Sequence, residues 1–227
     1  MPPPKTSFKM PPHKNISQTM NKLKQHFNYT DRTTLNRMKG KEDAFKILIS
    51  CLLSLRTKDE VTEKVSENLF KIADTPQQII SIPTSKLEKI IFSTGHYKKK
   101  SQILKHASNE ILNRFNNQVP STREELISIK GIGPKTANIV LNFAFNQDVL
   151  PIDTHCHRIP NRLGWIKTPT AEKSEFALMK VLPKEYWGDF NGIFVLFGKN
   201  ICLPISPLCS KCPINESCER NGVDKSR

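Results

Sequence analysis

The sequence lacks long apolar runs and has only six cysteines. A membrane-spanning helix needs about 18 apolar residues in a row. The longest candidate, Ile47 to Leu55, is far shorter and is interrupted by Ser50 and Ser54. The N-terminus has prolines where a signal peptide would have its apolar centre. We therefore expect no membrane association and a reducing compartment, the cytoplasm with its nucleoid or, in a eukaryote, the nucleus.

Acidic residues are scarce, and residues 1–30 contain five lysines and no Asp or Glu. The whole chain has 35 Lys and Arg against 21 Asp and Glu, a formal net charge of +14. This balance is typical of proteins that bind a polyanion, and nucleic acid is a better candidate than an anionic membrane. A Lys-rich solvated surface is the alternative. The prolines among residues 1–15 predict a disordered basic arm.

No segment alternates with the period of two that a strand requires, so we predict an all-α chain. Its length allows one large domain or two small ones. Helical patterns cover residues 16–38, 43–55 and 59–71, with Ile72 on the apolar side of the third. Pro76 and Pro83 mark two further short helices, and residues 95–100 open another.

A helix, a glycine turn and a second helix are predicted over residues 121–145. Ser121 and Glu124 fit a capping box, and the first helix stops at Gly131. Gly133 follows, and Pro134 suits the first position of the second helix. Glycines let a backbone approach a ligand closely, and the free N–H groups of a helix start attract phosphate. The pattern indicates an anion site, although a plain helix corner would look similar.

Four cysteines lie close together near the end of the chain, spaced Cys202-x6-Cys209-x2-Cys212-x5-Cys218. Three prolines among them keep the segment out of regular structure, so the thiols can surround one centre from a loop. Four thiolates suit an iron–sulfur cube or a single zinc ion. Two disulfides are the remaining alternative.

Residues 121–158 resemble the helix-hairpin-helix DNA glycosylases, and within them the endonuclease III family. The resemblance rests on residues 131–138 (GIGPKTAN), on residues 153–155 (DTH), on the cysteine spacing and on residues 52–54 (LLS), and it covers roughly residues 20–220. It implies an enzyme that flips a damaged nucleotide out of the duplex. It also implies that the cysteines hold a structural [4Fe–4S] cluster.

The resemblance assigns catalysis to Lys135 and Asp153. Lys135 would attack the sugar C1′ as a neutral amine, a form that burial and nearby positive charge favour. Asp153 would activate the lysine or stabilise the developing positive charge of the sugar. Each residue also has a simpler interpretation, a phosphate contact for Lys135 and a helix N-cap for Asp153.

The family pattern further predicts a set of DNA contacts. Arg56 departs from the glutamine that many bacterial members have, and a longer cation there would fill the gap left by the flipped base. His155 is either a pocket residue or a structural histidine. The full predicted set is Ser54, Arg56, Gly131, Ile132, Gly133, Lys135, Thr136 and His155.

The predicted architecture is two all-α domains with a DNA-binding groove between them. Residues 39–149 would form a six-helix barrel with the hairpin, and residues 16–38 plus 150–227 the cluster domain. The expected substrate is double-stranded DNA with an oxidised pyrimidine, such as thymine glycol, or an abasic site. The expected enzyme is a monomer that cleaves the strand by β-elimination through a lysine Schiff base.

Several alternatives stay open. An adenine glycosylase would have a glutamate near Cys51, no lysine at position 135 and an additional C-terminal domain. A mismatch thymine or uracil glycosylase shares the cluster but usually replaces the lysine. A non-catalytic, metal-stabilised DNA-binding module would need neither Lys135 nor Asp153. An iron–sulfur electron carrier fits poorly with the net charge of +14.

Overall fold

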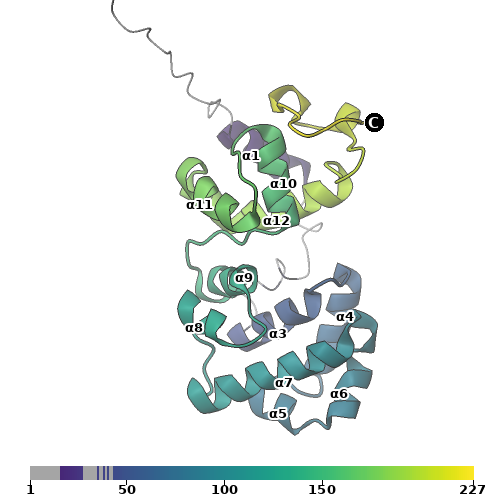
Figure 1. Ribbon diagram of the computed structural model, residues 1–227. Helices are drawn as coiled ribbons and strands as arrows, with labels where there is room; N and C mark the ends of the chain where they lie inside the picture. Colours follow the sequence, from purple (N-terminus) through teal and green to yellow (C-terminus); the bar gives the residue numbers. More distant parts are fainter. Residues whose placement is uncertain (1–15, 28–34, 36–37, 39, 41–42) are drawn as a thin grey trace, which may run out of the picture. The chain divides into compact units, whose positions relative to one another are not determined.

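A computed structural model describes residues 16–27, 35, 38, 40 and 43–227. These residues form helices and no strand, as the sequence predicts (Figure 1). No helix among them is long and apolar enough to cross a membrane. The predicted basic arm, residues 1–15, lies outside the described residues.

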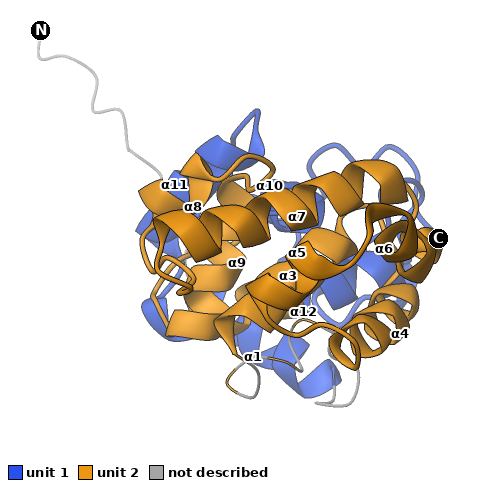
Figure 2. Ribbon diagram, turned by 90° about the horizontal axis from the view of Figure 1, so that it is seen from below, with its two compact units in different colours: residues 1–29, 152–186, 193–227 blue, residues 30–151, 187–192 orange. Residues whose placement is uncertain are grey.

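The chain divides into two compact units, coloured separately in Figure 2. Unit 1 comprises Met1–Tyr29, Ile152–Tyr186 and Ile193–Arg227, and unit 2 comprises Thr30–Pro151 and Trp187–Gly192. The sequence assigned residues 187–192 to the cluster domain, whereas here they group with unit 2. The six-helix barrel and the groove between domains stay predictions.

Unit 2 contains seven of the described α-helices and one 3-10 turn. They are α3 (Ala44–Ser54), α4 (Asp59–Phe70), α5 (Pro76–Ser81), α6 (Thr84–Ile90), η3 (Phe92–Thr94), α7 (Tyr97–Arg114), α8 (Arg123–Ser128) and α9 (Pro134–Phe145).

Helix α3 is the centre of unit 2. It begins after Asp43, whose carboxylate caps it by accepting from the Lys46 N–H at 2.9 Å. Most of its side chains are buried, and it packs against α4, α7 and α9. A helix that is apolar on nearly all sides belongs in a core, which is where the sequence placed it.

Three local predictions are wrong. Helix α8 is capped by Thr122, one residue after the predicted Ser121, because Thr122 Oγ1 faces the Glu125 N–H at 3.4 Å. It ends at Ser128, before the predicted Gly131. Ile72 is 48% exposed, because α4 has ended and the chain has turned away from its apolar side. The first predicted helix, residues 16–38, is observed as α1 from Ile16 to His26, and most of its remainder lies outside the described residues.

Unit 1 is built from the remaining helices. They are α1 (Ile16–His26), α10 (Thr154–Leu163), α11 (Ala171–Val181), η4 (Lys184–Tyr186), α12 (Trp187–Asn200), η5 (Cys209–Lys211) and η6 (Asn215–Ser217), of which α12 has its first residues in unit 2. Aromatic rings form much of the core. Phe197 lies 6.5 Å from the Phe27 ring, and Phe194 lies 5.7 Å from Trp165. The first of these contacts joins the residue that follows α1 to the last third of the chain.

Candidate functional site

The two glycines of the hairpin between α8 and α9 have different surroundings. Gly131 has φ +100°, and a Cβ there would lie 2.7 Å from Ile103 Cγ2. Gly133 has an ordinary φ of −96°, and a Cβ there would have no atom within 4 Å. Gly131 is therefore required by the fold. The fold does not require a glycine at position 133. The missing side chain of Gly133 therefore matters only for a ligand that approaches the hairpin from solvent.

Lys135 lies in the first turn of α9, half-buried, directly after Pro134 at the helix start. The buried thiol of Cys51 on α3 is close enough to feel its charge and bonds the Thr136 hydroxyl. Burial raises the pKa of Cys51 to about 11, and the Lys135 charge and the Thr136 hydrogen bond only partly oppose this. Cys51 is thus a neutral, buried thiol in the neighbourhood of Lys135.

Arg56 stands in the turn that follows α3. Its side chain is exposed and its backbone is left-handed, with φ +55°. Few non-glycine residues adopt this conformation, and holding one there costs about 1–3 kcal/mol. Ser54, the last residue of α3, donates its hydroxyl to Cys51 O at 2.8 Å. The turn therefore presents Arg56 to solvent directly after the helix that carries Cys51.

Asp153 is the N-cap of α10, as one of its two predicted roles requires. Its Oδ1 accepts from the N–H groups of His155 at 2.9 Å and Cys156 at 2.8 Å. These bonds fix the direction of the carboxylate at the start of the helix.

His155 is held by a second group in unit 1. Arg158 Nη2 lies 3.2 Å from His155 Nδ1 and donates to Cys202 O at 2.7 Å. An arginine only donates, so His155 Nδ1 is the acceptor in this contact. A Cβ on Gly198 of α12 would lie 2.1 Å from His155 Nδ1. The absence of a side chain at position 198 leaves room for this histidine.

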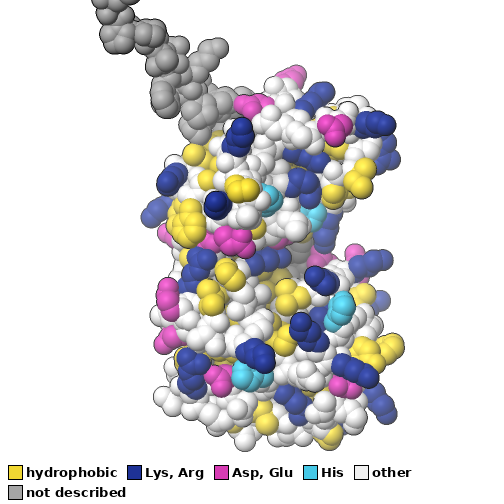
Figure 3. Space-filling model, viewed as in Figure 1, with side chains coloured by type: hydrophobic (Ala, Val, Ile, Leu, Met, Phe, Trp, Pro, Cys, Tyr) yellow, Lys and Arg dark blue, Asp and Glu magenta, His cyan; other side chains and the backbone are white. Residues whose placement is uncertain are grey.

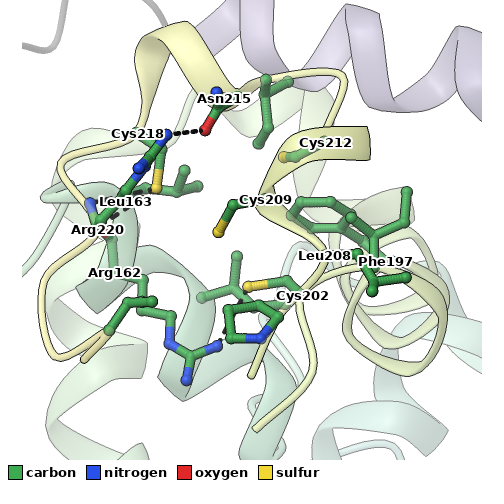
Figure 4. Close-up of a pocket in the computed structure, with 15 residues that line it drawn as sticks. Arg162, Leu163, Phe197, Cys202, Leu208, Cys209, Cys212, Asn215, Cys218 and Arg220 are labelled. Carbon is green, nitrogen blue, oxygen red and sulfur yellow. Dashed lines mark hydrogen bonds between the residues drawn. The ribbon is translucent and has the colours of Figure 1, made fainter. Parts of the chain in front are cut away.

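The four cysteines surround one pocket in unit 1 (Figure 4). Its other walls are mainly apolar and include Leu163, Phe197 and Leu208. Two N–H groups point at sulfur: Arg162 Nη1 lies 3.5 Å from Cys202 Sγ, and the Arg220 N–H lies 3.4 Å from Cys218 Sγ. Donors of this kind commonly bond to the sulfur atoms of metal-bound cysteines.

The pocket offers four thiols as possible metal ligands. Among the residues that the structure describes, no three His, Cys, Asp or Glu side chains are placed to hold one metal ion. Four sulfurs around one zinc would lie about 3.8 Å apart, given Zn–S bonds of about 2.3 Å. Burial, and then the charges of the other three cysteines, raise the pKa of Cys212 to about 11. A cationic group at the centre removes this repulsion.

The structure brings the predicted residues together in two groups. Unit 2 contains the hairpin with Lys135 and Thr136, and the turn with Ser54 and Arg56. Unit 1 contains Asp153, His155 and the four cysteines of the pocket. Lys and Arg side chains are spread over the face drawn in Figure 3. Sequence reasoning missed Gly198 and the buried Lys100, which act on His155 and Leu53. Their partners lie tens of residues away, so no local pattern marks them.

Comparisons with known proteins agree on one family. The family described as "HhH-GPD superfamily base excision DNA repair protein" matches residues 49–184. The chain is 45% identical to Endonuclease III of Thermotoga maritima over 177 residues, 78% of this chain and 83% of that one. It is 38% identical to Endonuclease III of Buchnera aphidicola subsp. Baizongia pistaciae over 175 residues, 77% of this chain and 81% of that one.

Solved structures give the same picture. A trapped endonuclease III–DNA covalent intermediate has a TM-score of 0.82 at 30% identity, and the match covers 93% of this chain and 97% of that one. A thermostable thymine-DNA glycosylase has a TM-score of 0.79 at 23% identity over 91% and 96% of the two chains, which shows a shared fold.

Proposed function

The chain belongs to the HhH-GPD superfamily of base-excision DNA repair proteins, within its endonuclease III family, and we propose that it excises oxidised pyrimidines. As a member of that family it is a DNA glycosylase and abasic-site lyase. The observation that carries the proposed mechanism is the place of Lys135. It lies half-buried in the first turn of α9, directly after a glycine hairpin that leaves room for a DNA backbone.

Lys135 acts as the nucleophile. Its neutral amine bonds to C1′ of the damaged nucleotide while the bond from C1′ to the base breaks and the base leaves with that electron pair. Loss of a proton and opening of the sugar ring give an imine between Lys135 and C1′. Removal of a C2′ proton then expels the 3′ phosphate, which cleaves the strand, and water releases the lysine.

Asp153 supports the first of these steps electrostatically. As the base departs, positive charge develops on the sugar. A carboxylate that two backbone N–H groups hold in place stabilises this charge without having to reorganise. The N-cap and the catalytic roles are compatible, because capping uses Oδ1 to set the direction of the carboxylate. His155, held by Arg158, contributes a contact to the DNA backbone.

The remaining contacts separate by chemistry. Gly131, Ile132, Gly133 and Thr136 bring backbone N–H groups and a hydroxyl to phosphate at the start of α9. Arg56, with Ser54 behind it, enters the space that the flipped nucleotide leaves and faces the orphaned base. An arginine presents several donors at once, so it suits hydrogen bonds to a purine edge.

The four cysteines hold a [4Fe–4S] cluster. Four thiols from one loop, an apolar pocket and N–H donors to two sulfurs support this choice. The cluster, when bound, supplies structural order to the loop and takes no part in bond cleavage. Iron and sulfide analysis of the purified protein tests this, because a zinc protein would contain one zinc and no sulfide.

The substrate is double-stranded DNA with a damaged base or an abasic site, and a single chain is sufficient to act on it. The enzyme therefore works wherever the cell keeps its DNA. A mismatch thymine or uracil glycosylase is the second candidate, since one relative of the same fold is a thymine-DNA glycosylase. Duplexes with thymine glycol, uracil or a mismatched thymine, compared at equal enzyme concentration, separate the two.

Single-turnover cleavage of a thymine glycol duplex tests the mechanism. Lys135→Gln should lose both base release and cleavage, while a gel-shift assay shows that binding is retained. Lys130→Gln, which removes an exposed charge on the other side of the hairpin, should keep its activity. Equal losses in the two variants would mean that Lys135 only contacts phosphate. Asp153→Asn should slow base release about 100-fold or more.

A further inference from the structure

Lys100 is a buried lysine whose ammonium group has three acceptors in unit 2. Its side chain enters the core from α7, and the residue is only 5% exposed. Lys100 Nζ donates to Leu53 O at 2.7 Å, to Thr57 Oγ1 at 2.6 Å and to Thr94 O at 3.0 Å. The three acceptors use all three protons of the ammonium. They are neutral oxygens, so this is not a buried ion pair.

These acceptors lie on both sides of Arg56. Leu53 is in the last turn of α3, where free carbonyls and the helix dipole favour a cation. Thr57 follows Arg56, and its hydroxyl contacts the same two carbonyl oxygens as Lys100. It lies 2.9 Å from Leu53 O and 2.7 Å from Thr94 O. The Thr57 N–H also donates to Ser54 O at 3.0 Å. The turn that carries Arg56 is closed at both ends by one network.

The same ammonium group lies where the backbone is strained. Arg56, between the acceptors Leu53 and Thr57, has φ +55°. Gly95 and His96, which directly follow the third acceptor residue, Thr94, have φ +66° and +47°. Left-handed residues persist only where their surroundings determine them. A buried lysine is costly to desolvate, so a hydrophobic residue would be the simpler choice for a core. Position 100 therefore serves the geometry of these turns more than it serves core packing.

We propose that Lys100, together with Thr57, is a positioning pair that holds Arg56 ready to enter the duplex. The inference rests on the role of Arg56 given above. Lys100 itself does not contact DNA. It fixes the left-handed turn before DNA arrives, so that inserting Arg56 requires no reordering of the loop. Preorganisation of this kind raises the rate on duplex substrates and leaves the chemistry at Lys135 unchanged.

The test compares an abasic site in a duplex with the same site in a single strand, where there is no orphaned base for Arg56 to meet. Lys100→Met keeps the length of the side chain and removes its donors. We expect it to lower the single-turnover duplex rate about tenfold and to leave the single-strand rate unchanged. Lys99→Met is the matched control, because it removes an exposed charge from the same helix. Thr57→Val serves as the second variant if Lys100→Met does not fold.

Arg56→Ala decides whether the effect passes through Arg56. If Lys100 acts by positioning, the double variant Arg56→Ala with Lys100→Met will be no slower on duplex than Arg56→Ala alone. Additive losses, or a Lys100→Met rate equal to that of Lys99→Met, overturn the inference while the role of Arg56 stands. No duplex loss in Arg56→Ala removes that role and the inference with it. Single-strand cleavage by every variant reports separately that the lyase is intact.

Discussion

The two hairpin glycines should respond oppositely to substitution by alanine. Gly131→Ala places a Cβ 2.7 Å from Ile103 at φ +100°, so we expect a loss of about 1–3 kcal/mol in the free energy of unfolding. Gly133→Ala meets no atom within 4 Å, so stability should change by less than about 0.5 kcal/mol. Its affinity for duplex DNA should nevertheless fall, because the new methyl group would crowd the phosphate that we propose binds there. Denaturant unfolding and a binding titration of both variants give the four values.

Lys100 predicts a pH dependence of stability. Burial lowers the pKa of Lys100 from its ordinary 10.5 to about 8 in the folded chain. Below pH 8 both states bind the proton, and the charged amine opposes folding. Between about pH 8 and 10.5 the unfolded state binds more protons, so stability rises with pH.

The measurement is the difference in free energy of unfolding between the native protein and Lys100→Met. From pH 8 to pH 10.5 the free energy of unfolding of the native protein should rise by up to about 3 kcal/mol relative to that of Lys100→Met. Each unit of pKa shift contributes 1.36 kcal/mol. The difference cancels contributions from other groups. A difference that stays flat over this range would show that Lys100 titrates normally in the fold.

Helix α10 connects the predicted catalytic carboxylate to the cysteine loop. Asp153 caps its start, and Arg162, near its end, donates to Leu203 O at 2.6 Å and to Pro204 O at 2.7 Å. The loop itself has little regular structure, only the short turns η5 and η6. Its order therefore depends on these arginine contacts and on whatever the four cysteines bind.

Removal of the proposed cluster should consequently unfold the loop. Cys212→Ser should lose iron and lower the midpoint of thermal unfolding by about 10 °C or more. At this chain length each kcal/mol lost from the free energy of unfolding lowers the midpoint by about 2–4 °C, and the loss here should be several kcal/mol. Amide exchange should become fast in residues 202–227 while α3 stays protected. Cys156→Ala, outside the tetrad, should keep its iron. An iron-free variant with unchanged exchange in the loop would refute the structural role.

Elements with strong local signals could be predicted from the sequence. Asp43 and Pro134 mark the starts of α3 and α9 because each acts on its own helix. The cap of α8 was misplaced by one residue because Ser121 and Thr122 are chemically equivalent N-caps, and only packing selects between them. Gln147 bonds the Ser121 carbonyl at 2.7 Å, a contact 26 residues away in sequence.

Site residues followed the same rule. Lys135, Asp153 and the cysteines stand in short motifs, so a resemblance could propose roles for them. Lys100 and Gly198 act on partners more than 40 residues away, Leu53 and His155, and a lysine among lysines or a glycine in a helix gives no sign of this. Such residues become visible only when the chain is folded.

For the molecule as a whole, the charge of +14 predicts steep salt dependence of binding. Each phosphate neutralised contributes about −0.9 to the slope of log K against log salt. With six or more contacts, affinity for undamaged duplex should fall about 1,000-fold or more from 50 to 200 mM salt. Lys135→Gln should change that slope by at most about one unit. Affinity that is insensitive to salt would mean that the basic surface is merely solvated.

The central claim is that Lys135 bonds to the sugar of a damaged nucleotide. Borohydride reduces an imine to a stable amine, so it traps the enzyme on a thymine glycol duplex only if that bond forms. We predict a covalent adduct whose modified peptide contains Lys135 and which is missing in Lys135→Gln, although that variant still binds the duplex. An adduct that persists in Lys135→Gln, or that maps to another residue, would contradict the account.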